Sequence, residues 1–164
     1  MKIDLFSTTC FSRETDNFGI DDVEIAKVVP FDDGIAKVQN LQKCSIFFIP
    51  LDKNIECLRP DGSMESQCDA LLIYSRSENK YDFYFVELKE ANKTKSWITD
   101  GSEQLKTTIN TFKSSYNLSC LLKRMAFLAN KSHPNYHYKH TALMEEFKNL
   151  TGFRLNICAT IRIK

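Results

Sequence analysis

The chain of 164 residues contains no long apolar run and no internal repeat. No stretch approaches the ~20 consecutive apolar residues that a membrane-spanning helix needs. Its first residues, MKIDLFSTTCFSRETD, include no continuous apolar segment of the kind found in secretory signals. We therefore expect a protein that has no membrane partner and resides in the cytoplasm.

The chain also lacks paired cysteines. Its six cysteines are scattered, and no two have the CxxC spacing of a metal or redox site. Several lie in apolar stretches, which favours free thiols in a core over disulfides. No Gly/Ser-rich linker interrupts the sequence, and its length suits one substantial core better than two, so we expect residues 1–164 to form a single domain.

What the chain does have is charge, and the charge is unevenly distributed. The formal net charge is only +1, but residues 1–87 carry nine Lys and Arg against sixteen Asp and Glu. Residues 89–140 carry nine against three. Such a separation is typical of an acidic pocket beside a basic surface, as in an enzyme that acts on polyanions. Charges scattered over a solvated surface are the alternative.

Short apolar stretches predict strands in the first half of the chain. Residues 44–51 form an apolar run that ends near Pro50. Residues 68–74 and 81–89 are rich in aromatic and β-branched residues, and the polar residues 75–80 between them predict a hairpin. The segment DDVEIAKVV in the first third fits either a helix or a strand.

Helical spacing appears in the second half. A helix is predicted from Asp100, with Glu103 three residues later as a capping box. Its apolar stripe comprises Leu105, Ile109, Phe112 and Tyr116.

The remainder of the chain predicts a further strand, a helix and a last strand. These are residues 124–130, residues 141–150 with Gly152 after the helix, and a strictly alternating tail over residues 153–162. The predicted class is α/β (α+β mixed), with a central mixed β-sheet flanked by helices.

The register of the predicted hairpin places three ionisable residues together. If the turn is centred near residue 78, opposed residues have numbers that sum to 156, so Asp69 lies opposite Glu87 with their Cβ atoms roughly 5 Å apart. Side chains two apart on a strand point the same way, so Lys89 joins that face. A surface ion pair between Glu87 and Lys89 is the alternative, but FYFVEL is apolar on both faces, as in a central strand.

Two carboxylates at this distance indicate a cation site. With help from the Leu88 carbonyl, Asp69 and Glu87 would hold a hard cation such as Mg²⁺ (or Mn²⁺) that keeps several of its waters. Such an ion assists phosphodiester cleavage, because it polarises the phosphate and lowers the pKa of a bound water. An adjacent ammonium can position that water and stabilise the charge that builds on the phosphate.

The order of these residues resembles the PD-(D/E)xK nuclease superfamily, which has the restriction-endonuclease-like fold. In that family an acidic residue starts the second core strand, ExK ends the third, and the following helix packs across the sheet. The resemblance implies that Asp69 and Glu87 bind the metal, that Lys89 positions the attacking water, and that Gln104 supports the site from the helix. Members similar to RecB-type nucleases carry QxxxY on that helix, whereas this chain has Thr108 where the Tyr would stand.

The chain departs from the family pattern at two further places. Asp69 follows Cys68, while the literal Pro60-Asp61 precedes a glycine in a predicted loop, so we prefer Asp69. The family often has a further Glu on its first helix. Glu24 is the candidate here, and Glu65 is the alternative if the strand of Asp69 begins earlier.

Several residues are candidates for contact with nucleic acid. We expect Lys93, Lys95 and Lys106 to bind it. Trp97 fits a packing anchor or a base-stacking residue. The segment SHPNYHYKH fits an ordinary polar loop, a loop that touches the nucleic-acid backbone, or a zinc site.

The sequence thus predicts a Mg²⁺-dependent nuclease that hydrolyses phosphodiester bonds in DNA, with RNA as the alternative substrate. No helix-turn-helix or zinc finger is recognisable, so specificity would come from loops, a homodimer or a partner subunit. Bacterial DNA repair, restriction and phage defence would all suit such a domain. The alternatives are an inactive module of the same fold that binds nucleic acid or a protein, and a toxin nuclease or its immunity partner.

Overall fold

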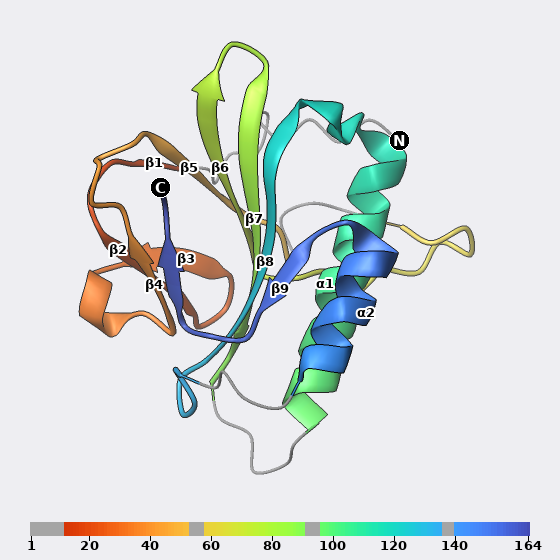
Figure 1. Cartoon of the computed structure of the whole chain (residues 1–164). Coiled ribbons are helices and arrows are strands. Elements are labelled where there is room, and N and C mark those ends of the chain that lie inside the picture. Colours follow the sequence, from red (N-terminus) through yellow and green to blue (C-terminus); the bar gives the residue numbers. More distant parts are fainter. Residues whose placement is uncertain (1–11, 53–57, 91–95, 136–139) are drawn as a thin grey trace.

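The computed structural model describes residues 12–52, 58–90, 96–135 and 140–164. Within these ranges the chain forms strands, two α-helices and two short 3₁₀ turns (Figure 1). In chain order they are β1 (Ser12–Glu14), β2 (Phe18–Asp22), β3 (Ala26–Val29), η1 (Phe31–Asp33), β4 (Ala36–Gln39), β5 (Ile46–Pro50), β6 (Ala70–Ser77), β7 (Lys80–Lys89), α1 (Ser96–Ser115), η2 (Leu118–Cys120), β8 (Leu121–Asn130), α2 (Thr141–Thr151), β9 (Arg154–Asn156) and β10 (Thr160–Arg162).

A six-stranded mixed sheet forms the centre of the structure. Its order is β1-β5-β6-β7-β8-β9, with antiparallel pairing from β1 to β7 and parallel pairing of β7 with β8 and β8 with β9. The parallel pairs require crossovers, and α1 and α2 supply them. Both helices lie on one face of the sheet (Figure 1), where Leu71, Phe85 and Leu105 belong to one buried cluster.

A second sheet covers the opposite face. It has the order β10-β4-β2-β3, and its side chains Ile20 and Val38 share a second buried cluster with Leu72 and Val86 of the large sheet. The structure is therefore a mixed α/β protein with two helices and two mixed sheets. The predicted class agrees at this level, but the helices of the described ranges flank only one face of the central sheet.

The ambiguous segment in the first third forms strands rather than a helix. β2 and β3 pair antiparallel, and the turn between them contains Glu24. Ile20 and Ala26 are buried in the second cluster, so the packing of a sheet face decides between the two local possibilities. Of the two possibilities the strand is confirmed, so Glu24 does not lie on a helix, where the resembled family carries its additional acid.

The predicted start of the long helix is also wrong. α1 begins at Ser96, so Asp100 lies inside the helix and cannot act as its N-cap. Trp97 and Ile98 are buried in the first turn, and their packing extends the helix beyond the polar capping pattern. The apolar stripe is confirmed in Leu105, Ile109 and Phe112, which are buried, and in Tyr116, which packs against the same cluster.

The alternating tail has the predicted faces but forms two strands. Phe153, Leu155, Ile157, Ala159 and Ile161 are all buried, as the alternation predicts. β9 pairs with β8 of the large sheet, whereas β10 pairs with β4 of the small sheet, so the chain crosses between the sheets at residues 157–159.

The second helix ends as predicted. Gly152 follows α2 in the left-handed conformation, with φ of 78°, and its N–H donates to the Lys148 carbonyl at 2.8 Å.

Four cysteines lie in the described part of the chain, Cys44, Cys68, Cys120 and Cys158, and all four are free thiols. Only Cys68 is fully buried. Cys10 and Cys57 lie outside the described residues. Among the helices of the described ranges, none has the length and apolar character needed to cross a membrane.

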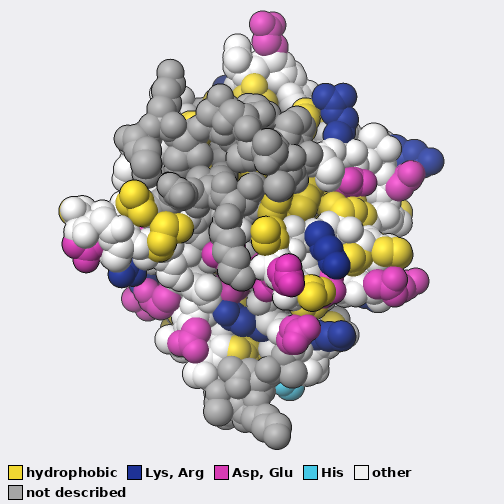
Figure 2. Space-filling view, turned by 180° about the vertical axis from the view of Figure 1, so that it is seen from behind, with side chains coloured by type: hydrophobic (Ala, Val, Ile, Leu, Met, Phe, Trp, Pro, Cys, Tyr) yellow, Lys and Arg dark blue, Asp and Glu magenta, His cyan; other side chains and the backbone are white. Residues whose placement is uncertain are grey.

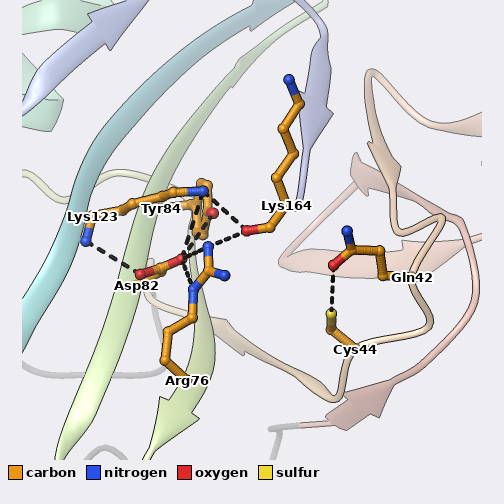
Figure 3. Close-up of polar contacts among 7 residues, drawn as sticks. All are labelled: Gln42, Cys44, Arg76, Asp82, Tyr84, Lys123 and Lys164. Carbon is orange, nitrogen blue, oxygen red and sulfur yellow. Dashed lines mark hydrogen bonds and ion pairs between the residues drawn. The ribbon is translucent and has the colours of Figure 1, made fainter.

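The starting half of β7 carries an ion-pair network around one buried acid (Figure 3). Asp82 is fully buried, and its Oδ2 accepts a hydrogen bond from Arg76 Nε at 2.7 Å. Its Oδ1 accepts from the Lys123 N–H at 3.2 Å. Arg76 and Lys123 also donate to the Lys164 carbonyl, which ties the last residue of the chain to the large sheet.

Candidate functional site

The register of the β6–β7 hairpin brings Asp69 to Glu87. Ala70 pairs with Val86 and Leu71 with Phe85, which is the predicted register. Asp69 directly precedes β6, and its Oδ2 accepts a hydrogen bond from the Leu88 N–H at 2.6 Å. The carboxylate thus takes the place of a main-chain partner where the pairing of the two strands ends.

Lys89 is held between a strand and a helix. Its Nζ lies 2.6 Å from Glu87 Oε1 and donates to Gln104 Oε1 at 2.7 Å. Glu87 is buried, whereas the Lys89 side chain is 24 % exposed. The structure therefore brings Asp69, Glu87, Lys89 and Gln104 together at the end of β7, where α1 begins and β8 ends (Figure 1).

Helix α1 also fixes the backbone that precedes Asp69. Thr108 Oγ1 accepts a hydrogen bond from the Cys68 N–H at 2.7 Å, and Gln104 Nε2 donates to the Gln67 carbonyl at 3.5 Å. Thr108 occupies the position at which the resembled family has a Tyr. Sequence reasoning gave it no role, because a hydroxyl bonded to a backbone amide 40 residues away leaves no local pattern.

Gly101 allows α1 to pack closely on Leu128 of β8, next to Glu87. A Cβ atom at this position would lie 2.4 Å from Leu128 Cδ1 and 3.4 Å from Glu87 Cγ. A glycine inside a helix costs roughly 1 kcal/mol relative to alanine, and the close packing of α1 on the Leu128 side chain is a physical reason for its presence. The predicted capping box placed this glycine in the first turn of the helix. A glycine there needs no packing explanation, so the close contact was not predicted.

Burial dominates the electrostatics of the two carboxyl groups. It raises the pKa of Asp69 to about 6, against the Leu88 hydrogen bond, and the charges of Asp22 and Asp52 raise this pKa further. Burial also raises the pKa of Glu87 to about 8, and the nearby charge of Asp69 adds to the effect, while Lys89 opposes it.

One oxygen of this pair has no partner. Glu87 Oε2 is buried without a hydrogen-bond donor among the described residues, and Glu87 can hydrogen-bond Asp69 only when one of the two carboxyl groups is protonated. A buried acceptor without a partner is costly, and two facing carboxylates repel each other when both are charged. A proton or a cation between them would relieve both costs.

The site offers oxygen atoms that fit a divalent cation. The Leu88 carbonyl is a third oxygen. The Lys89 carbonyl points toward β8, where it accepts a hydrogen bond from the Lys131 N–H. Because the carbonyls of successive residues in a strand point to opposite sides, the Leu88 carbonyl points toward β6. Within the described ranges, no group of three or more His, Cys, Asp or Glu side chains is arranged to hold a metal. Two carboxylates with a carbonyl suit Mg²⁺, which keeps several waters.

The two candidates for an additional acid are Glu24 and Glu65. Glu24 is in the β2–β3 turn and lines a surface groove of about 540 Å³ together with Ser12 and Pro50. Glu65 precedes β6 and forms an ion pair with Arg59 at 3.3 Å. The acids whose charges act on Asp69 are instead Asp22 and Asp52, which sequence reasoning missed because neither lies in the hairpin.

The rejected Pro-Asp pair lies in an exposed loop. Asp61 Oδ1 accepts hydrogen bonds from the Ser63 N–H and hydroxyl at 2.9 and 2.6 Å, and Gly62 between them has φ of 83°. These local bonds lower the pKa of Asp61. The predicted loop around Asp61 is confirmed, and the preference for Asp69 as the site acid stays a prediction.

Lys106, a predicted nucleic-acid contact, is not with the group around Lys89. It pairs with Glu103 at 2.5 Å and lines a small crevice between α1 and α2 with Phe147. Lys93 and Lys95 lie outside the described residues. On the face drawn in Figure 2, acidic and basic side chains are interspersed, which matches the alternative of scattered charges for that face.

Comparison with known proteins adds no relative. No protein-family model, curated protein or solved structure matches this chain significantly.

Proposed function

We propose that this protein is a metal-dependent nuclease of the restriction-endonuclease-like fold that hydrolyses phosphodiester bonds in DNA. One observation carries the proposal: Asp69 and Glu87 face each other beside Lys89, and Glu87 Oε2 is buried without a partner. Raised pKa values for both acids, about 6 and about 8, are typical of functional carboxylates.

The order of elements around the site supports the proposal. With β5 as the first core strand, an acidic residue starts the second strand, ExK ends the third, and α1 then packs across the sheet. This is the order in the PD-(D/E)xK superfamily, which the sequence resembles.

Each residue of the site has a distinct role in this proposal. Asp69, Glu87 and the Leu88 carbonyl would hold Mg²⁺ or Mn²⁺. The ion would polarise the phosphate and lower the pKa of a bound water. Lys89 orients the attacking water and stabilises charge on the phosphate. Gln104 fixes the direction of the Lys89 ammonium through their 2.7 Å hydrogen bond.

A cleavage assay with matched variants tests this function. The protein is mixed with single-stranded DNA, double-stranded DNA and RNA in Mg²⁺, Mn²⁺ or EDTA. Asp69→Asn is compared with Asp61→Asn, which changes the exposed acid of the Pro-Asp pair. Metal-dependent cleavage that Asp69→Asn abolishes and Asp61→Asn preserves supports the proposal, and absence of cleavage of every substrate contradicts it.

A second candidate is an inactive module of the same fold that binds nucleic acid or a protein partner. The Glu87–Lys89 ion pair at 2.6 Å favours it, because the two charges compensate each other without a cation. Calorimetry with Mn²⁺ separates the candidates: uptake that is lost in Glu87→Gln supports the nuclease, and no uptake supports the binding module. A cytoplasmic role in bacterial DNA repair, restriction or phage defence, alone or with a second subunit, is part of the nuclease proposal.

A further inference from the structure

The loop that follows β8 begins beside the candidate site. Asn130, the last residue of β8, pairs with Lys89 of β7. The next residue, Lys131, donates its N–H to the Lys89 carbonyl at 2.9 Å. Residues 131–135, which we call the β8 loop, are all exposed.

Hydrogen bonds hold the β8 loop at three points. Asn130 Oδ1 accepts from the Ser132 N–H at 2.8 Å, and the Asn130 carbonyl accepts from the His133 N–H at 3.2 Å. At the other end, the Pro134 carbonyl accepts from the Ala159 N–H at 3.0 Å. The loop therefore presents its side chains from a backbone that is anchored to the central sheet and to the crossing between the sheets.

An aromatic pair lies at this edge of the structure. The rings of His133 and Trp97 are parallel within 3°, with centroids 6.0 Å apart. Trp97 is 4 % exposed and packs in the core at the start of α1, whereas His133 is exposed. The buried indole thus supports an exposed imidazole in an offset stack.

We propose that the β8 loop binds a single-stranded segment of the substrate, with one base stacked on His133 and an adjoining phosphate contacted by Lys131. The inference rests on the proposed nuclease function and adds its substrate class. Bases inside a duplex are stacked on each other and expose only their edges. The exposed imidazole of His133 can therefore stack only on a base that has left the duplex or belongs to a single strand. Lys131 supplies a positive charge next to the strand end where the phosphate is cleaved.

The chain contains its own reporter for this contact. Trp97 is the only tryptophan in the sequence, so its fluorescence reports on the ring stacked against it. Titration with a single-stranded oligonucleotide is done in EDTA, where metal-dependent cleavage does not occur. The oligonucleotide should quench this fluorescence until the binding site is saturated. The same strand built with abasic residues keeps the phosphates and removes the bases, so it should quench weakly.

Variants separate stacking from charge. Base stacking on an aromatic ring is worth 5- to 150-fold in affinity, so His133→Ala should weaken binding of the normal strand by at least about 5-fold. His133→Phe keeps a ring and should restore most of the affinity, whereas His133→Lys keeps only a charge and should not. Lys131→Ala should lower the slope of log affinity against log salt by about one.

The outcomes distinguish this inference from the nuclease proposal. Binding that depends on His133, with no cleavage in Mg²⁺, leaves the inference standing for the binding module and overturns the nuclease. Cleavage with equal affinity in His133→Ala, or equal quenching by the abasic strand, overturns the inference and leaves the nuclease. A preference for duplex over single strand also overturns it.

Discussion

Strand β7 carries two buried carboxyl groups whose surroundings are opposite. Asp82 faces the small sheet near the start of the strand, and Arg76, Lys123 and the Tyr84 hydroxyl surround it. Glu87 faces α1 near the end of the strand, and it meets a second carboxyl group while one of its oxygens has no partner. The two groups are 0 % and 1 % exposed, so burial does not distinguish them.

The difference lies in how each charge is balanced. Around Asp82, two cationic side chains and a backbone N–H satisfy both oxygens, as expected of a carboxylate that serves the structure. Around Glu87, a single ammonium is shared with Gln104, and the second carboxylate adds repulsion. Glu87 therefore keeps one buried oxygen that no donor among the described residues satisfies, whereas both oxygens of Asp82 are satisfied.

The largest expected effect is on activity. Glu87→Gln should reduce metal-dependent cleavage at least about 100-fold, because it removes a charged metal ligand. Asp82→Asn should leave the rate per folded molecule nearly unchanged. Single-turnover cleavage at a temperature where both variants are folded measures this, and equal losses in the two variants would refute the contrast.

The next effect concerns pH and stability without metal. The pKa of Glu87 is about 8 in the folded chain against an ordinary 4.5, so the folded chain binds more protons than the unfolded chain between these pH values. The free energy of unfolding should therefore fall as pH rises through this window, by on the order of 4 kcal/mol from this group. Denaturant unfolding at pH 5 and pH 8 should show that Glu87→Gln loses most of this pH dependence.

Added Mg²⁺ should reverse that trend. A cation displaces protons from the two carboxyl groups, so it should stabilise the wild type more at pH 8 than at pH 5. A stabilisation by Mg²⁺ that is the same at both pH values would count against binding at Glu87.

The third effect is structural. Asp82→Asn should lower the free energy of unfolding by about 2 kcal/mol, because it leaves Arg76 and Lys123 without their anion. The value is below that of a fully buried pair, since these side chains are 27 % and 39 % exposed. Asp16→Asn, which breaks the exposed pair with Lys43, is the control and should cost less than about 0.5 kcal/mol.

The smallest effect tests the support from α1. Thr108→Val leaves the buried Cys68 N–H without its acceptor and should cost about 1 kcal/mol. Thr111→Val removes a hydroxyl of the same helix that bonds only within the helix, so it is the matched control. If Thr108 positions Asp69, cleavage by folded Thr108→Val should fall while cleavage by Thr111→Val is unchanged.

The sequence predicts features that depend on neighbouring residues. The register of β6 and β7 follows from a short turn and strict side-chain alternation, and it was enough to bring Asp69, Glu87 and Lys89 together. The stripe of α1 follows in the same way from helical spacing.

Features that depend on distant packing were missed or wrong. The start of α1 is set by burial of Trp97 and Ile98, and the tail divides because two different sheets take its two halves. The influence of Asp22 on Asp69 arises only when the small sheet packs on the large one. None of these contacts has a signature in the local residue pattern.

The bond from Cys68 to Thr108 has a consequence for folding. It joins residues 40 positions apart, and such contacts form only after a large loop has closed. The hairpin can form its turn early, yet Asp69 reaches its final place only when α1 docks. If α1 alone undocks, the site residues should lose their positions while the small sheet stays folded. Hydrogen exchange of the Cys68 amide would measure how often this happens.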